Sequence, residues 1–418
     1  MILSVFSLMA QEAPYILSLD SCISMALTNN RKAVTARNNI DEAVSMKREA
    51  FTKYFPEIAA GGVAFWANHD IIQYNLLNII ELGMINRGKL AGVQAVQPVF
   101  MGGQIVNGNK LAGVGEDVAE LRRQQTDNEL RLTTEEMYWK LVTLKATRLT
   151  LTDGIATLDS LKKEVKTAVE AGVALNNDLL KVEIKRNSYL SELIDVENGI
   201  TLMKMLLGQY VGLGISGNIE VLGEVPDEIP ALPQNMYMAT EEALPATTDY
   251  RLLQKNVEAK SLEKRMEIGS HLPSVAFGAG WYYHDLFDQN HNFGALQIIV
   301  DIPLSGWWGG GYAIKRKDIA LATAKIELED LSEQIRIGIR DKWNNLTAAQ
   351  RKMGIEKESV AQSEENLRLN RMYYEAGMST ISDLLDAETE VQKARSRYIA
   401  SYGEYRSACA AYMIATGR

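Results

Sequence analysis

Two long stretches of the chain, 99–225 and 304–418, contain no proline and repeat their apolar residues at helical spacing. Steps of three, four or seven residues place such side chains on one face of an α-helix. The residues concerned are Leu151, Ile155, Leu158, Val165 and Val169 in the first stretch and Leu328, Leu331, Ile335, Ile339, Trp343 and Leu346 in the second. Proline inside a helix costs about 3 kcal/mol, so its absence favours the same structure. Each stretch is predicted to be a very long helix, a turn and a returning helix.

Each stretch has one Glu-Ala-Gly sequence where its turn is expected. Residues 170–180 read EAGVALNNDLL, and residues 375–385 read EAGMSTISDLL. Glycine just past a helix end, here Gly172 and Gly377, is a usual stop signal. The two glycines are 205 residues apart, and so are the aspartates that follow them. This constant spacing indicates that the chain contains two copies of one unit.

Ahead of each long helix the pattern changes from helical to alternating. Two β-hairpins are predicted, at about 57–97 and about 274–302, because large and small side chains alternate there. In the second hairpin one face carries Val275, Phe277, Ala279, Trp281 and Tyr283. Aromatic residues gather near the strand ends, at Trp66, Trp281, Trp307 and Trp308. The second hairpin therefore has one apolar face, the first is less regular, with strand-like segments at 57–67 and 91–97, and both have aromatic residues near strand ends.

The chain is accordingly divided into a first repeat, 11–208, a Gly- and Pro-rich linker, 209–235, and a second repeat, 236–418. Each repeat runs helix, hairpin, long helix, turn, helix. The first helices are expected at 17–54 and 236–271. The junctions between helix and strand are marked by Pro56, Pro98, Pro273 and Pro303. The linker is compatible with one short strand at about 219–222.

Residues 1–10 form a short apolar run followed by Gln-Glu-Ala-Pro. They resemble the end of a secretory signal cleaved after Ala10, which favours export over a cytosolic start.

Cys22 and Cys409 allow a bridge between the first and last helices, but two unpaired, buried thiols are favoured.

The composition excludes some classes of protein. A net charge of −9 argues against nucleic acid as a partner, although it also serves simple solubility. No run of eighteen apolar residues occurs, so a transmembrane helix is not expected. No Ser/His/Asp order, zinc spacing or phosphate-binding loop is found, so neither an enzyme nor a cofactor is predicted.

Strands of this length and pattern suit a membrane β-barrel, whose strands have about 9–11 residues. Four strands are too few, because a barrel needs at least about eight and an open edge is not tolerated in lipid. The barrel must be shared: two chains would supply eight strands and three would supply twelve. The long helices would then assemble in the same symmetry, into a tube. The alternative is a structural periplasmic coiled-coil protein with hairpin inserts.

Over nearly its whole length the chain resembles the TolC family of outer-membrane efflux proteins, the outer membrane factors. The resemblance rests on the twice-repeated order of elements and on three strings. They are PVFMGG at 98–103, PLSG at 303–306 with Gly309 and Gly310 beyond it, and YEAGMSTISDLLDAE at 374–388. The second copy departs from the pattern by two inserted residues around Trp307 and Trp308.

The resemblance implies a mixed, mostly α fold. Long antiparallel helical hairpins would form a trimeric α-barrel across the periplasm, continued by a twelve-strand membrane β-barrel with four strands per subunit. It implies a homotrimer in outer-membrane lipid that docks to a periplasmic adaptor (membrane fusion) protein and an inner-membrane transporter of the RND or ABC type. The function implied is passive: an exit duct of a tripartite efflux or type I secretion system. The transported substrate is not identified.

The resemblance also implies the site residues. Asp383 and Asp386 match the aspartates that ring the periplasmic constriction, where threefold symmetry would bring six carboxylates together and raise some of their pKa values. Tyr374, Asn177 and Asp178 match residues that link the two turns in the closed state. The alternative role of an aspartate here is to cap the start of a helix.

Two further positions bear on this site. The arginine of the family falls at Ser379, which cannot make the same charged contacts. Ser382 or Asp383 is expected to open the last helix.

At the outer loops, a solvated tip is favoured over a metal site for His69 and for the group His284, Asp285, Asp288 and His291.

Overall fold

The computed structural model describes residues 15–71, 73–76, 80–83, 85–215, 218–232, 235–286, 289–304 and 306–418. The expected leader remnant at 1–10 lies outside these residues, as does Asp288. By its contacts the chain forms two compact units. The first comprises 15–38, 121–251 and 331–418, and the second comprises 39–120 and 252–330, within the described ranges.

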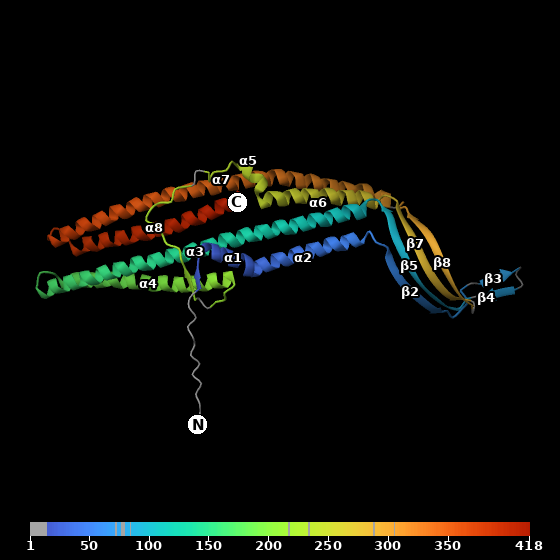
Figure 1. The fold of residues 1–418 in the computed structure, drawn as a ribbon, viewed down its shortest axis with the longest axis horizontal. Coiled ribbons are helices and arrows are strands. Elements are labelled where there is room, and N and C mark those ends of the chain that lie inside the picture. The colour runs from blue at the N-terminus through green and yellow to red at the C-terminus, as the bar shows by residue number, and fades with distance from the viewer. Residues whose placement is uncertain are drawn as a thin grey trace, which may run out of the picture. The chain divides into compact units, whose positions relative to one another are not determined.

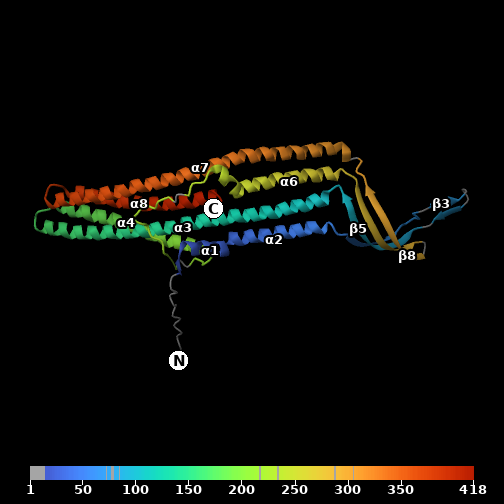
Figure 2. The same ribbon diagram turned by 45° about the horizontal axis from the view of Figure 1, so that its top comes forward.

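Two long helical hairpins dominate the structure. Helix α3 (Gln104–Glu170) is followed by α4 (Asn176–Val211), and α7 (Gly306–Glu375) is followed by α8 (Ile381–Ala415). Figures 1 and 2 both show α4 beside α3 and α8 beside α7. With 67 residues, α3 is on the order of 100 Å long at about 1.5 Å per residue.

The first expected helix is divided in two. Helix α1 (Leu19–Asn29) ends and α2 (Arg31–Thr52) begins at Asn30, whose ψ of 137° leaves the helical region. The Asn30 side chain stabilises this break, because Oδ1 accepts a hydrogen bond from the Lys32 backbone N–H at 2.9 Å. Its Nδ2 donates to the Tyr210 carbonyl at 2.9 Å, which ties the break to α4. The prediction of one continuous helix was therefore wrong at this residue.

The helix expected at 236–271 is also interrupted. It consists of α5 (Thr240–Ala243), a 3-10 turn (Leu244–Ala246) and α6 (Thr248–Ser270). Pro245 lies in the 3-10 turn, and proline lacks the N–H that a continuous helix would need there. This local signal was present in the sequence and explains the break.

Four antiparallel strands form one sheet in the second unit. They are β2 (Glu57–Trp66), β5 (Arg87–Met101), β7 (Ser274–Leu286) and β8 (Gln289–Asp301), in the order β2-β5-β7-β8. The two hairpins thus join through β5 and β7 (Figure 1). In the loop of the first hairpin, β3 (Gln73–Leu76) and β4 (Ile80–Gly83) form a separate pair.

Three of the four prolines expected at junctions lie between a helix and a strand, and Pro98 does not. It is inside β5, at a register shift between Pro98 and Phe100. Proline is accommodated there because a bulge releases the backbone from regular pairing.

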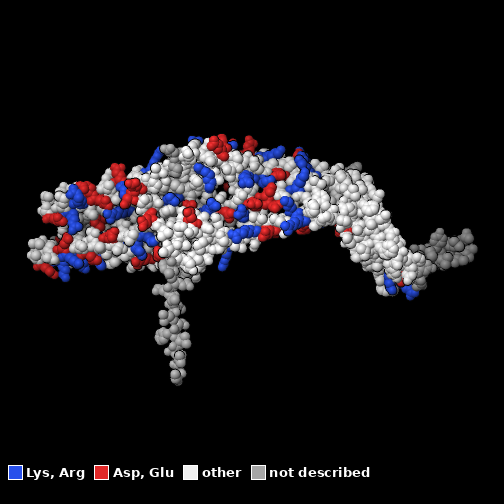
Figure 3. Space-filling view, in the orientation of Figure 1, with Lys and Arg blue, Asp and Glu red and all other residues white. Residues whose placement is uncertain are grey.

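The register gives the sheet two different faces. Phe277 pairs with Ile298, and Val93 pairs with Trp281, so these apolar side chains share one face. Much of this face is uncovered: Ile298 is 74% exposed. The opposite face, called the polar face below, carries polar and small residues, among them Gln94, Gly278, Tyr282, His284, His291 and Gln297, beside apolar residues such as Leu90 and Phe293. In Figure 3 the visible surface of the strands shows few charges, whereas charges of both signs cover the helical parts.

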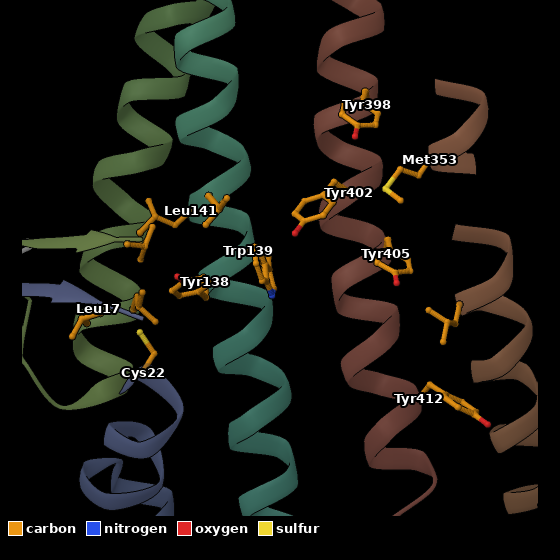
Figure 4. Packing of buried hydrophobic residues seen from close by; sticks show 14 of the residues in the cluster. Leu17, Cys22, Tyr138, Trp139, Leu141, Met353, Tyr398, Tyr402, Tyr405 and Tyr412 are labelled. Carbon is orange, nitrogen blue, oxygen red and sulfur yellow. The ribbon is translucent and has the colours of Figure 1, made fainter. Parts of the chain in front are cut away.

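The core of the first unit lies where its helices meet the short parallel pair β1 (Tyr15–Leu17) and β6 (Ile219–Val221). Aromatic residues are prominent in it (Figure 4). Trp139 of α3 meets Tyr402 of α8 edge to face, with ring centroids 5.5 Å apart. Cys22 is fully buried in this core and Cys409 packs against it, and both thiols are free.

In the second unit, α6 and the end of β5 touch through two glycines. A Cβ atom at Gly269 would lie 2.3 Å from the Gly102 carbonyl oxygen, and one at Gly102 would lie 2.0 Å from the Gly269 carbonyl oxygen. Gly102 also has a φ of +58°, in the region that favours glycine. The backbones can therefore approach only while both residues are glycine.

We expect Gly269→Ala to destabilise the protein by about 1–3 kcal/mol, because the methyl group forces the two backbones apart. The measurement is the unfolding midpoint of the purified protein in detergent. Gly113→Ala, in α3, is the matched control, since no atom lies within 4 Å of its added Cβ. Equal midpoints for the two variants would contradict the prediction.

Candidate functional site

The turns after α3 and α7 have the same backbone geometry. The N–H groups of Val173 and Met378 each donate to the carbonyl five residues back, at 2.9 and 2.8 Å. Gly172 and Gly377 have φ angles of +75° and +72°, which an L side chain rarely adopts. The duplication seen in the sequence therefore extends to the hydrogen bonds that end both long helices.

The starts of the returning helices differ. Helix α8 begins at Ile381 with Thr380 as its cap, and not at Ser382 or Asp383 as expected. The Asp383 N–H donates to Thr380 Oγ1 at 3.3 Å, and the Thr380 N–H donates to Asp383 Oδ2 at 2.9 Å. The equivalent residue before α4 is Leu175, which has no side-chain oxygen to accept such a bond. Because Thr380 and Asp383 exchange hydrogen bonds, Thr380 is the cap and α8 begins at the next residue, Ile381.

Asp383 and Asp386 are both exposed and lie one turn apart on α8. The opposite side of the same turn is buried, through Ile381, Leu384 and Leu385. Hydrogen bonds from the Thr380 hydroxyl and backbone N–H lower the pKa of Asp383. The subunit itself thus keeps Asp383 ionised, and both carboxylates are free to face another molecule or another copy.

Tyr374, at the end of α7, packs against the apolar cluster between the hairpins. Burial raises the pKa of Tyr374, and the charges of Asp178 and Glu164 raise it further. Asp178 is therefore near Tyr374, whereas Asn177 is exposed at the start of α4.

A direct hydrogen bond between the two turns is made by a different residue. Lys181 Nζ donates to Ser382 Oγ at 2.9 Å and lies 3.7 Å from Asp178 Oδ1. A second link joins Arg371 of α7 to Glu164 of α3 at 3.3 Å. Lys181 was not assigned a role from the sequence, although it occupies the position of Asp386 in the other copy. That reversal of charge between equivalent positions was the signal that could have identified it.

Close to the second turn, α3, α7 and α8 enclose a cavity of about 220 Å³. It is lined by apolar residues, such as Leu161 and Leu384, together with Glu388 and Arg371. Glu388 is only 8% exposed, and burial raises the pKa of its carboxyl group. Its burial depends on α3 and α7, so the sequence around Glu388 does not reveal it.

Within the described ranges, no group of three or more His, Cys, Asp or Glu residues could hold a metal ion. Nor is any helix of these ranges both long and apolar enough to span a membrane.

Comparisons with known proteins agree on one kind of fold. No family model matches the chain. It is 21% identical over 340 residues to the outer membrane efflux protein BepC of Brucella suis, covering 78% of this chain and 72% of that protein. The crystal structure of the outer membrane protein VceC from Vibrio cholerae superposes with a TM-score of 0.80 at 17% identity, over 96% of both chains. That of CusC superposes with a TM-score of 0.82 at 15% identity, over 100% of this chain and 96% of CusC. The chain therefore has the fold of the outer-membrane channels of the TolC family, which its sequence resembles.

Proposed function

We propose that this protein is an outer-membrane exit duct that conducts substrates outward from the periplasm. The observation that carries the proposal is the four-stranded sheet with an uncovered apolar face, joined in one chain to two very long helical hairpins. A water-soluble protein would bury such a face. The likeness to BepC, named an outer membrane efflux protein, supports the same function.

The sheet favours an assembly of three copies. Its outer strands, β2 and β8, each have one edge that no described strand of the chain pairs with. Edges are not tolerated in lipid, and three copies would close a barrel of twelve strands. Helix α4 also exposes apolar side chains that a neighbouring copy would cover, including Ile184 (69%) and Ile194 (59%). A homotrimer explains both features.

Aromatic residues support a membrane boundary where β8 leads into α7. Trp308 and Tyr312, four residues apart on α7, are 87% and 82% exposed. Trp and Tyr favour the interface between lipid and water, where their rings meet hydrocarbon and their polar groups meet water. Trp308 and Tyr312 would thus contact the outer-membrane lipid at its boundary.

The turns are proposed as the periplasmic gate. Asp383 and Asp386 of three copies would form a ring of six carboxylates, and Tyr374, Asn177 and Asp178 would hold the closed state together with Lys181. Repulsion within the ring would raise some carboxyl pKa values, against the lowering that each subunit gives Asp383. Gly172 and Gly377 form the turns, and Pro56, Pro273 and Pro303 mark the junctions between helix and strand, whereas Pro98 lies inside β5.

We propose that the duct consists of two repeats, 11–208 and 236–418, joined by a linker at 209–235.

An outer-membrane duct that spans the periplasm requires a pump to load it, so we propose a periplasmic adaptor protein and an inner-membrane transporter as partners. The turns are the ends that would open to them. The cargo would be selected by those partners, because a passive duct has little selectivity.

Migration of the protein in membrane fractions tests the proposal against a periplasmic coiled coil. An outer-membrane trimer should sediment with the outer membrane, require detergent for extraction and run at three times the monomer mass until it is boiled. A coiled-coil protein should appear in the periplasmic fraction without detergent. Recovery of the protein in that soluble fraction would overturn the proposal.

A further inference from the structure

Two histidines stand directly opposite each other near the end of the β7–β8 hairpin. His284 of β7 and His291 of β8 are cross-strand partners in the register. Their imidazole rings are nearly parallel, with an interplanar angle of 17° and centroids 5.5 Å apart. Both lie on the polar face of the sheet, opposite to the face of Trp281 and Ile298.

The chemistry of the pair is that of a metal chelate. Nδ1 of His284 is shielded from solvent and has no hydrogen-bond partner among the described residues. An unpaired, buried nitrogen is unfavourable, and a neutral imidazole nitrogen is a common ligand of Zn²⁺, Cu²⁺ and Ni²⁺. Such ions bind nitrogen at about 2.0–2.1 Å, so two nitrogens can share one ion when they are about 4.2 Å apart or less. Rotation of side chains whose ring centroids are 5.5 Å apart can meet this requirement.

The surroundings leave room for the ion and its water. His284 lines a hollow of about 600 Å³, whose other lining residues are mainly apolar, such as Leu90 and Phe293, with Gln94 and Tyr282 among the polar ones. Asp285 is not a third ligand, because consecutive strand residues face opposite sides and its carboxylate lies 4.0 Å from Lys89. Each subunit therefore supplies two protein ligands, and water would complete the coordination.

We propose that His284 and His291 form a binding site for a divalent transition-metal ion, of the class of Cu²⁺, Ni²⁺ and Zn²⁺, on the polar face of the sheet. The site within one chain does not depend on the proposed function. If the sheet closes into a threefold barrel, as proposed above, its polar face lines the pore and three such sites encircle it. Metal bound there would narrow the duct at the hairpin end, far in sequence from the Asp383 ring.

Titration of the purified, untagged full chain in detergent with Cu²⁺ tests the site, by calorimetry and by electron paramagnetic resonance. The wild type should bind one ion per subunit, with a signal from two imidazole nitrogens. His284→Asn and His291→Asn should each lower the affinity at least about tenfold, or about 1.4 kcal/mol, and leave one nitrogen. The double variant should lose the site.

His271→Asn is the matched control. His271 lies 3.5 Å from Glu267 and precedes the start of β7, at the other end of the strand from His284, so its loss should leave Cu²⁺ binding unchanged. Equal binding by the wild type and the double variant would overturn the inference, as would a two-nitrogen signal in His284→Asn. Because binding is measured on the isolated protein, its loss would leave the duct proposal standing, and failure to form a membrane trimer would leave the metal site testable.

Discussion

Replacing Asp383 and Asp386 together by alanine should abolish the block of single-channel current by divalent cations. Both carboxylates are exposed, and three copies would gather six of them around one axis. Rings of carboxylates bind cations because their mutual repulsion is relieved by an ion of opposite charge. We expect the blocking concentration of Mg²⁺ to rise at least tenfold, which corresponds to about 1.4 kcal/mol or more. Planar-bilayer recordings at neutral pH measure it directly.

A second variant separates charge from helix capping. Asparagine at both positions removes the charge but keeps an oxygen that can accept the Thr380 N–H bond. It should lose the block as fully as the alanine variant, but with a smaller loss of thermal stability, because the cap keeps an acceptor and loses only its charge. Asp153→Asn with Asp195→Asn, two exposed carboxylates of α3 and α4, is the control of matched charge and should retain the block. Unchanged block in the double asparagine variant would remove the ring assignment.

The pH dependence of the cap has a defined sign. The pKa of Asp383 is lowered in the folded subunit, so the stability that its ionised form gives to the start of α8 is present above its unfolded pKa of about 3.9. It is lost as the pH falls through the lower, folded value. Recordings at neutral pH therefore keep the cap intact in the wild type.

Replacing Lys181 by methionine should raise the resting conductance. Its ammonium group donates to Ser382 of the other hairpin, and methionine keeps the apolar stem without the donor. A hydrogen bond from a charged donor contributes about 1.5–3 kcal/mol when buried, and a half-exposed one about 1 kcal/mol. The ratio of open to closed channels should therefore increase roughly fivefold. The measurement is the open probability of single channels without a pump present.

The neighbouring tyrosine and a second lysine refine this experiment. Tyr374→Phe should raise the conductance less than Lys181→Met, because Lys181 donates a hydrogen bond to the other hairpin, whereas Tyr374 is mainly packed in the apolar cluster between the hairpins. Lys166→Met is the matched control, because Lys166 lies 4.0 Å from Glu170 of its own helix and, among the described residues, makes no ion pair or hydrogen bond to a second element. A Lys181→Met channel that is as closed as the Lys166→Met channel would show that another contact holds the turns.

Much of the fold could be predicted because its signals are local. The bounds of α3, the two glycine turns and the alternation of β7 and β8 follow from residues within a few positions of one another. The constant spacing of 205 residues then showed that the same helix–turn–helix pattern occurs twice. The sequence by itself thus determined the order of elements and the resemblance to outer-membrane ducts.

Predictions of helix ends and helix breaks were wrong where several local signals compete. Asn30 and Pro245 each interrupt a helix that was predicted to be continuous. At α8 three candidate caps stand within four residues, and Thr380 is selected because it exchanges hydrogen bonds with Asp383. Caps and breaks of this kind depend on hydrogen bonds that each contribute about 1 kcal/mol. The residue pattern alone does not show which of several such bonds forms.

Only the tertiary structure decided which residues meet across distant parts of the chain. It joins Lys181 to Ser382, brings Gly102 against Gly269 and buries Glu388 between helices. Within the β7–β8 hairpin, the pairing register decides that His284 stands opposite His291. Contacts between residues far apart in sequence depend on how the long helices and strands pack against one another. The residues next to each partner in the sequence do not indicate which residue it will contact. The candidate gate was therefore located by the sequence, while the contacts that would hold it closed came from the packing of the two hairpins.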